Sequence, residues 1–253
     1  MTGWPSLAPR AEAAPRTQML RAQARAELTL LLRNGEQVLL TLVIPLGLLV
    51  VLSTVDVIDV TGRRVDFFVP GVLALAVMST AFTGQAIGTG FERQYGVLKR
   101  LGATPLPRSV LLLAKTLAVL AVEVLQVALI SLVGLVLGWH PHGSFLGVVL
   151  LVVLGTAAFS GLGLLIGGTL RGLTTLAAAN LLWFVLLVLG GIVFPLRAYG
   201  GAADALRWLP TAALSDGLRQ LLEHGSLVGR DLLALVLWAA AGLTAAAKLF
   251  RWE

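Results

Sequence analysis

The stretch FLGVVLLVVLGTAAFSGLGLLIGGT, residues 145–169, decides the class of fold. It contains no charged residue, and its apolar residues are continuous rather than alternating with polar ones. About 20 apolar residues in helical form span the hydrocarbon core of a bilayer. In lipid, backbone N–H and C=O groups find hydrogen-bond partners only in helices or closed β-barrels. A barrel strand would show alternating apolar and polar residues, which this stretch does not. The stretch therefore predicts a transmembrane α-helix.

Five further runs of similar character occur along the chain. They cover residues 38–55, 67–91, 107–138, 174–195 and 231–250. The first contains Pro45, which predicts a kink of a kind that membrane helices tolerate. We therefore expect an all-α membrane protein whose six transmembrane helices form one domain, residues 38–250.

Composition supports this class and excludes others. Hydrophobic residues make up 57% of the 253 residues, and charged residues make up 13%. Soluble domains carry about 25% charged residues, and a chain of this size cannot hide so much apolar surface from water. The chain has no cysteine, which excludes disulfides and thiolate metal sites. A disordered chain, a disulfide scaffold and an ordinary soluble enzyme are all excluded.

The distribution of Lys and Arg predicts the orientation in the membrane. With both termini in the cytoplasm, six spans place 13 of the 19 Lys and Arg residues inside and 6 outside. We therefore expect an N-in, C-in topology, with cytoplasmic segments at 1–37 and 251–253. The net charge of +6 then fits contact with anionic lipid headgroups, and we expect no nucleic-acid partner.

Residues 17–34 have the pattern of an amphipathic helix lying at the membrane surface. Arg21, Arg25 and Arg33 recur at helical spacing and form a basic stripe. Such a helix beside a membrane span should lie in the interface. Two interpretations remain open, which are simple lipid anchoring and an additional contact with a cytoplasmic partner.

Residues 91–108, FERQYGVLKRLGATPLPR, form a short basic segment between the second and third predicted spans. Glu92, Gly96, Lys99 and Ala103 would share one face of a helix, and the prolines at 105 and 107 would end it. One interpretation is a basic loop that only fixes topology. The other is a rigid helix through which an outside protein pushes on two membrane helices.

This segment resembles the signature of ABC-2 type export permeases, a family that includes daunorubicin-resistance-like exporters. The pattern is Glu92-Arg93-x-x-Gly96-x-x-Lys99-Arg100-Leu101-x-Ala103-Thr104-Pro105-Leu106. The segments 68–73, 209–211, 216–219 and 250–252 resemble further parts of that family in the same order.

The resemblance implies a cytoplasmic coupling helix at 92–104 and an extracellular re-entrant hairpin at 197–230. ATPase coupling would then fall to Glu92, Arg93, Gly96, Lys99, Arg100, Leu101 and Pro105. It also implies two separate ATPase subunits that hold ATP and Mg, a second permease subunit, and a multi-pass location in a bacterial cell membrane.

The sequence agrees with a separate ATPase. A phosphate-binding P-loop requires a Gly-Lys pair, and none of the three lysines follows a glycine. The three histidines lie outside the predicted spans, without nearby partners for a metal site. We expect no cofactor, no metal and no catalytic residue in this chain.

Polar residues inside the spans are candidates for a translocation path, because they are costly in lipid. They are Gln85, Glu123, Gln126 and Asn180. Glu123 could line the path or bind a cationic group, or it could be a hydrogen-bonded carboxyl that holds two helices together. The apolar character of the remaining wall predicts a lipophilic or amphipathic substrate such as a drug, antibiotic or lipid.

In the segment 197–230, Asp216–Arg219 and Arg219–Glu223 have helical spacing. Pro210, Asp216 and Arg219 are candidates for an outer gate, and an amphipathic surface helix is the alternative. Gly163 and Gly167 have the spacing of a close helix contact. Taken together, the sequence predicts the permease subunit of an exporter, and the alternative is a membrane enzyme or assembly scaffold without a transport role.

Overall fold

The computed structural model describes residues 13–56, 60 and 62–250, without the side chains of 36–38 and 40. The predicted tail at 251–253 and the first 12 residues lie outside this range. The described chain is helical and contains no strand. Its centre is one long helix made of α3 (Arg64–Val77), a π-helical segment η1 (Met78–Gly84) and α4 (Gln85–Gln94). This helix is the most deeply buried of the candidate spans.

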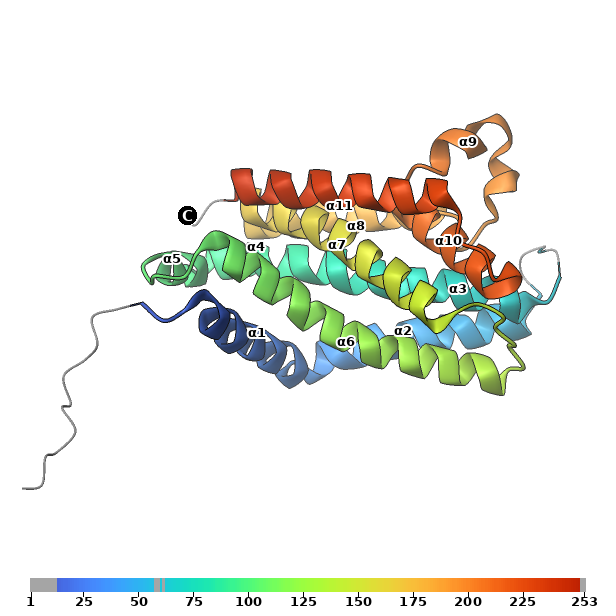
Figure 1. The fold of residues 1–253 in the computed structure, drawn as a ribbon, viewed down its shortest axis with the longest axis horizontal. Helices are drawn as coiled ribbons and strands as arrows, with labels where there is room; N and C mark the ends of the chain where they lie inside the picture. The colour runs from blue at the N-terminus through green and yellow to red at the C-terminus, as the bar shows by residue number, and fades with distance from the viewer. Residues whose placement is uncertain (1–12, 57–59, 61, 251–253) are drawn as a thin grey trace, which may run out of the picture.

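Five other long helices surround the central one (Figure 1). They are α2 (Gly35–Thr54), α6 (Arg108–Val136), α7 (Phe145–Thr169), α8 (Gly172–Leu189) and α11 (Gly229–Leu249). Their outer surfaces carry many exposed large apolar side chains, among them Val136, Phe145 and Leu181. Exposed apolar side chains of this kind are expected where the surrounding solvent is lipid.

Five helices are long and apolar enough to cross a membrane: the central helix, α6, α7, α8 and α11. This confirms five of the predicted spans. The predicted span 38–55 corresponds to α2, whose described apolar part, Thr41–Thr54, is shorter than the others. Its status as a sixth span remains a prediction. The predicted span 174–195 was too long, because α8 ends at Leu189 and Gly191 then adopts a positive φ of 71°.

Helix α7 packs closely on two neighbours because glycines line both of its contact faces. A Cβ atom on Gly163 would lie 2.6 Å from the Phe82 carbonyl oxygen of η1. On the other face, a Cβ on Gly161 would lie 2.6 Å from the Leu243 nitrogen of α11. Lipid tails are as apolar as the side chains, so apolar burial does not drive helices together in a membrane. Close backbone packing does, and small residues allow it. The predicted close contact at Gly163 and Gly167 is therefore formed within the subunit.

Helix α1 (Arg16–Arg33) confirms the predicted N-terminal helix and packs mainly against α6. Helix α1, helix α5 (Val97–Gly102) and the C-terminal end of α11 lie at one end of the bundle in Figure 1. We call this the α5 end. The opposite end carries η2 (Leu196–Ala202), α9 (Ala203–Leu206) and part of α10 (Pro210–His224), and we call it the α9 end.

The region predicted as a hairpin is helical, as its charge spacing indicated. It comprises η2 and α9 on one arm and α10 on the other. Helix α10 packs against α3, α7 and α11. Its leucines 214, 218, 221 and 222 are buried. The alternative of a surface helix does not fit this packing, because 11 of the 15 residues of α10 are buried.

Candidate functional site

The segment predicted as one coupling helix, 92–104, is divided in the structure. Helix α4 continues from the bundle to Gln94, and α5 covers only Val97–Gly102. Gly96 separates them with a φ of 71°, a conformation that side chains with a Cβ rarely adopt. The predicted continuous face through Glu92, Gly96 and Lys99 is therefore wrong. A Cβ on Gly96 would meet nothing within 4 Å, so the glycine serves the turn rather than a close approach.

Helix α5 is anchored by one apolar side chain. Leu98 is fully buried in a small cluster with Leu111, Leu164 and Phe250, which come from α6, α7 and the end of α11. Leu101 packs at the edge of this cluster. Three of the predicted coupling residues face outward: Lys99, Arg100 and Pro105 are exposed. The α5 end thus presents a basic surface on a fixed base.

Two neighbouring charged residues hold the last turn of α4 against different helices. The Lys115 ammonium of α6 donates to Glu92 Oε1 at 2.7 Å. Arg93 Nη1 donates to the Leu170 carbonyl oxygen at 3.2 Å, just beyond the C-terminus of α7. Arginine is a favourable partner for carbonyls at a helix C-terminus. The polar contact made by Glu92 therefore lies inside the protein.

Sequence reasoning missed both partners of Lys115, of which Glu92 is one. Its Nζ also donates to Glu27 Oε2 of α1 at 2.9 Å, and both side chains are buried. The predicted basic stripe of α1, formed by Arg21, Arg25 and Arg33, is exposed. Helix α1 therefore turns its carboxylate inward and its arginines outward, which a stripe analysis of the basic residues alone did not indicate.

A basic hollow lies between the last turn of α4 and the start of α8. It has a volume of about 630 Å³ and is lined by Arg93, Gln94, Arg171 and the first residues of α8. Helix α8 begins at Gly172, so its N-terminal N–H groups and partial positive charge lie at the same hollow. The hollow thus adds a second basic surface, formed by the end of α4 and the loop between α7 and α8.

Two predicted path residues connect α7 to its neighbours. Glu123 is fully buried and accepts a hydrogen bond from the Thr156 hydroxyl of α7. Gln85 of α4 donates to the Ser160 hydroxyl at 2.7 Å. Within one subunit, neither side chain is exposed. The interpretation of Glu123 as a hydrogen-bonded link between α6 and α7 agrees with this geometry.

Gln126 compensates for the missing N–H group of Pro45 in α2. Proline lacks an N–H group, so the carbonyl four residues earlier, on Thr41, loses its helical donor. Gln126 Nε2 of α6 donates to this carbonyl oxygen at 3.0 Å. Its Oε1 accepts from the Thr80 hydroxyl of η1 at 3.1 Å. The remaining path candidate, Asn180, lies on the exposed surface of α8.

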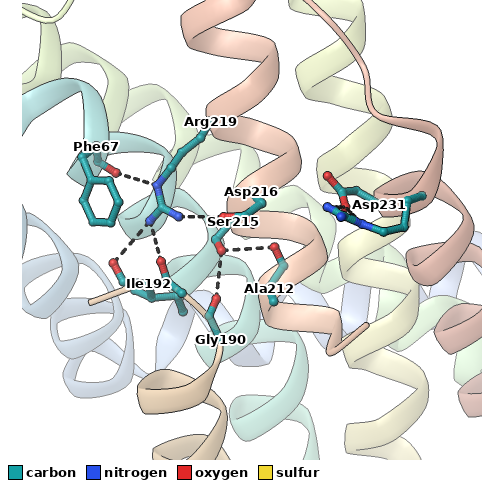
Figure 2. Close-up of polar contacts among 10 residues, drawn as sticks. Phe67, Gly190, Ile192, Ala212, Ser215, Asp216, Arg219 and Asp231 are labelled. Atoms are coloured by element: carbon teal, nitrogen blue, oxygen red, sulfur yellow. Dashed lines mark hydrogen bonds and ion pairs between the residues drawn. The ribbon is translucent and has the colours of Figure 1, made fainter. Parts of the chain in front are cut away.

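Arg219 is the centre of a buried polar cluster that fixes α10 (Figure 2). Its Nε donates to the Phe67 carbonyl oxygen of α3 at 3.1 Å, and its Nη2 donates to the Gly191 carbonyl oxygen at 2.6 Å. The guanidinium carbon also lies 3.9 Å from the centre of the Phe67 ring. The guanidinium thus joins α10 to α3 and to the backbone that follows α8.

The other predicted gate residues support this cluster. Asp216 Oδ1 accepts from Arg219 Nη1 at 3.1 Å, one turn earlier on α10. Ser215 adds a hydrogen bond to the Gly190 carbonyl oxygen at 2.9 Å. Pro210 begins α10 and is buried.

No group of three or more His, Asp or Glu side chains suited to a metal ion occurs in the described part of the chain. The described arrangement offers a basic surface at the α5 end and a tightly held inserted helix towards the α9 end.

Comparisons with known proteins give a consistent result. A family model described as ABC-2 type transporter matches residues 18–222. The protein named Putative transport permease YvfS, of Bacillus subtilis (strain 168), is 25% identical over 229 residues, covering 86% of this chain and 91% of YvfS. Daunorubicin resistance ABC transporter permease protein DrrB1, of Streptomyces coeruleorubidus, is 30% identical over 196 residues, covering 74% of this chain and 67% of DrrB1. The family match includes α5 and nearly all of α10.

Proposed function

Because the chain belongs to the ABC-2 type transporter family, it is a permease subunit of the cell membrane, and we propose that it forms the membrane part of an ATP-driven exporter. Family membership implies pairing with ABC ATPase subunits. The observation that carries the exporter proposal is α5, a short basic helix that is fixed at its base and exposed at its outer face.

The proposed topology has six spans, with α2 as the first, and places both termini and the α5 end in the cytoplasm. The excess of Lys and Arg near the α5 end supports this orientation. The α9 end is then extracellular, and α10 is a re-entrant helix. Arg219 supports this position for α10, since its hydrogen bonds satisfy carbonyl groups that would otherwise be unpaired at membrane depth.

Two ATPase subunits and two permease subunits make up the proposed complex. ATP and Mg bind to the ATPase subunits, whose closure on ATP moves α5 and, through it, α4 and α6. Lys99, Arg100 and the hollow at Arg93 and Arg171 offer a basic contact surface for acidic side chains of the ATPase. Alternating access of the paired permeases then moves the substrate outward.

The proposed substrate is lipophilic or amphipathic, and it leaves from the cytoplasm or the inner leaflet. Polar side chains such as Gln85 and Gln126 form hydrogen bonds between helices in the interior, and the exposed large side chains of the spans are mainly apolar. The printed name of DrrB1 refers to daunorubicin resistance, which supports testing a lipophilic drug as substrate.

The test is co-purification of the chain with a P-loop ATPase encoded in the same cell, followed by transport in inverted membrane vesicles. Daunorubicin and a fluorescent phospholipid serve as probes. We expect Lys99→Ala with Arg100→Ala to reduce ATPase binding, whereas Arg207→Ala, at a half-buried arginine of the opposite end, leaves it unchanged. Failure to recover an ATPase, with no ATP-dependent movement of either probe, would favour an enzyme or scaffold instead.

A further inference from the structure

Lys115 bridges two helices that otherwise pack on different neighbours. Helix α1 packs mainly against α6, whereas α4 packs mainly against α7 and α8. The single ammonium group reaches Glu27 of α1 at 2.9 Å and Glu92 of α4 at 2.7 Å. Glu27 is itself positioned by Gln23, whose Nε2 donates to its second carboxylate oxygen at 2.8 Å.

The bridge is sheltered but has room to rearrange. The Lys115 side chain is 6% exposed, and that of Glu92 is 24% exposed. A cavity of about 60 Å³ borders Glu27, Glu92 and Lys115. Glu92 Oε2, which is buried, accepts no hydrogen bond from any residue that the structure describes. A volume of this size holds water, since one molecule needs about 10–15 Å³.

The charges of the cluster explain why Lys115 connects both carboxylates. Two carboxylates share one ammonium, which has three N–H donors and can serve both at once. Each carboxylate would be left uncompensated in a buried site without it, which is strongly unfavourable. The ammonium therefore holds α1 and α4 in a fixed relative position. Loss of either arm removes the link but leaves the packing of each helix in place.

We propose that Lys115 is a positioning residue that ties the surface helix α1 to the last turn of α4, so that α1 and α5 move together. Glu92 lies only four residues before Gly96, the turn that begins α5. A displacement of α5 therefore reaches α1 through Glu92 and Lys115 as well as along the chain. The part of this inference that concerns coupling rests on the proposed function, and the part that concerns position does not.

The position of the two helices can be measured by spin labels. The chain has no cysteine, so Gln18→Cys on α1 and Ala103→Cys beside α5 add the only two labelling sites. Both residues are exposed. In the purified protein, we expect a narrow distance distribution. Lys115→Met broadens it, Lys115→Arg keeps it narrow, and the control Lys248→Met, at an exposed lysine of α11, leaves it unchanged.

A purely stabilising role gives a different result. In that case Lys115→Met lowers the melting temperature, but the distance distribution measured below that temperature stays narrow, and the proposal is overturned. If Lys115→Met does not fold, Glu92→Met is used, because it leaves no acceptor on the α4 arm and retains the pair of Lys115 with Glu27. An unchanged distribution in Glu92→Met overturns the proposal equally.

The coupling part is tested in the complex with the ATPase. We expect Lys115→Met to retain ATPase binding and to lose the stimulation of ATP hydrolysis by the permease, with recovery in Lys115→Arg. Full stimulation in Lys115→Met, despite a broadened distribution, would overturn coupling through this residue. Absence of any ATPase partner for the unmodified chain would count against the proposed function, and the distance measurement would still decide the positioning role.

Discussion

Replacement of Arg219 should strongly destabilise the protein, because its guanidinium serves three separate segments. Arg219→Met removes the charge and keeps an apolar side chain of similar length. The Phe67 and Gly191 carbonyl oxygens, which accept from Arg219 at 3.1 and 2.6 Å, then lose their donor. The hydrogen bond from Ser215 to Gly190 is the remaining tie of α10 to the backbone after α8 in this cluster.

The magnitude follows from these contacts. Hydrogen bonds that involve a charged group contribute about 1.5–3 kcal/mol each, so loss of two gives about 3–6 kcal/mol. Asp216 adds less, because its side chain is 25% exposed and water can solvate it. Removal of one partner from a buried charge pair costs about 3–5 kcal/mol in general, which agrees. At roughly 2–4 °C per kcal/mol, a loss of about 3–6 kcal/mol should lower the melting temperature by about 6–24 °C.

The assay is thermal unfolding of the purified protein in detergent, with Arg207→Met as the matched control. Arg207 pairs with Asp204, whose side chain is 89% exposed, so its loss should change stability by less than about 1 kcal/mol. Arg219→Lys should lie between the two, because an ammonium cannot reproduce the fork of the guanidinium. Equal melting temperatures for Arg219→Met and Arg207→Met would refute the assigned role of the cluster.

Three further predictions concern helix contacts. Gly163→Ala brings a Cβ to 2.6 Å from the Phe82 carbonyl oxygen and should lower the free energy of unfolding by about 1–3 kcal/mol. Gly88→Ala, whose Cβ would meet nothing within 4 Å, should not lower the melting temperature. Similar losses of stability in both variants would contradict the packing argument. Gln126→Leu should lower the melting temperature, because the Thr41 carbonyl then loses the donor that stands in for the missing N–H of Pro45. Pro45→Ala in the Gln126→Leu background should recover part of this loss, because alanine supplies the helical N–H. Simple additivity of the two substitutions would count against this link. Leu98→Ala should lower the free energy of unfolding by about 2–5 kcal/mol and raise the rate of amide hydrogen exchange selectively at 97–102. Unchanged exchange at these residues would show that Leu98 does not anchor α5.

The positions of most helices could be predicted from local composition. In lipid, length and hydropathy decide whether a segment spans, and both are local properties of the sequence. The run at 145–169 coincides with α7, and the basic pattern at 17–34 coincides with α1 within one residue. The ends of helices were less predictable where glycine was involved, because Gly96 and Gly191 tolerate both helical and positive φ values.

The candidate sites could be predicted only in part. Glu92 and Arg219 were identified by type and spacing, but the partners of Glu92 were not. Lys115 lies 23 residues from Glu92 and 88 residues from Glu27 along the chain. Helical spacing detects partners three or four residues apart, and it detected the pair Asp216–Arg219. Main-chain carbonyls, which are the chief partners of Arg219, leave no signal in a sequence at all.

The sequence by itself therefore determined the solvent of this protein, its helical class, its family resemblance and the locations of its scarce charges. These follow from apolar content and from motifs that are short along the chain. Only the tertiary structure decided which way each charge faces: Arg21 outward, Glu27 inward to Lys115, and Arg219 into the carbonyls beyond α8. The physical reason is that a charge enclosed within the helix bundle must find a partner, and the partner is supplied by whichever helix the packing brings alongside.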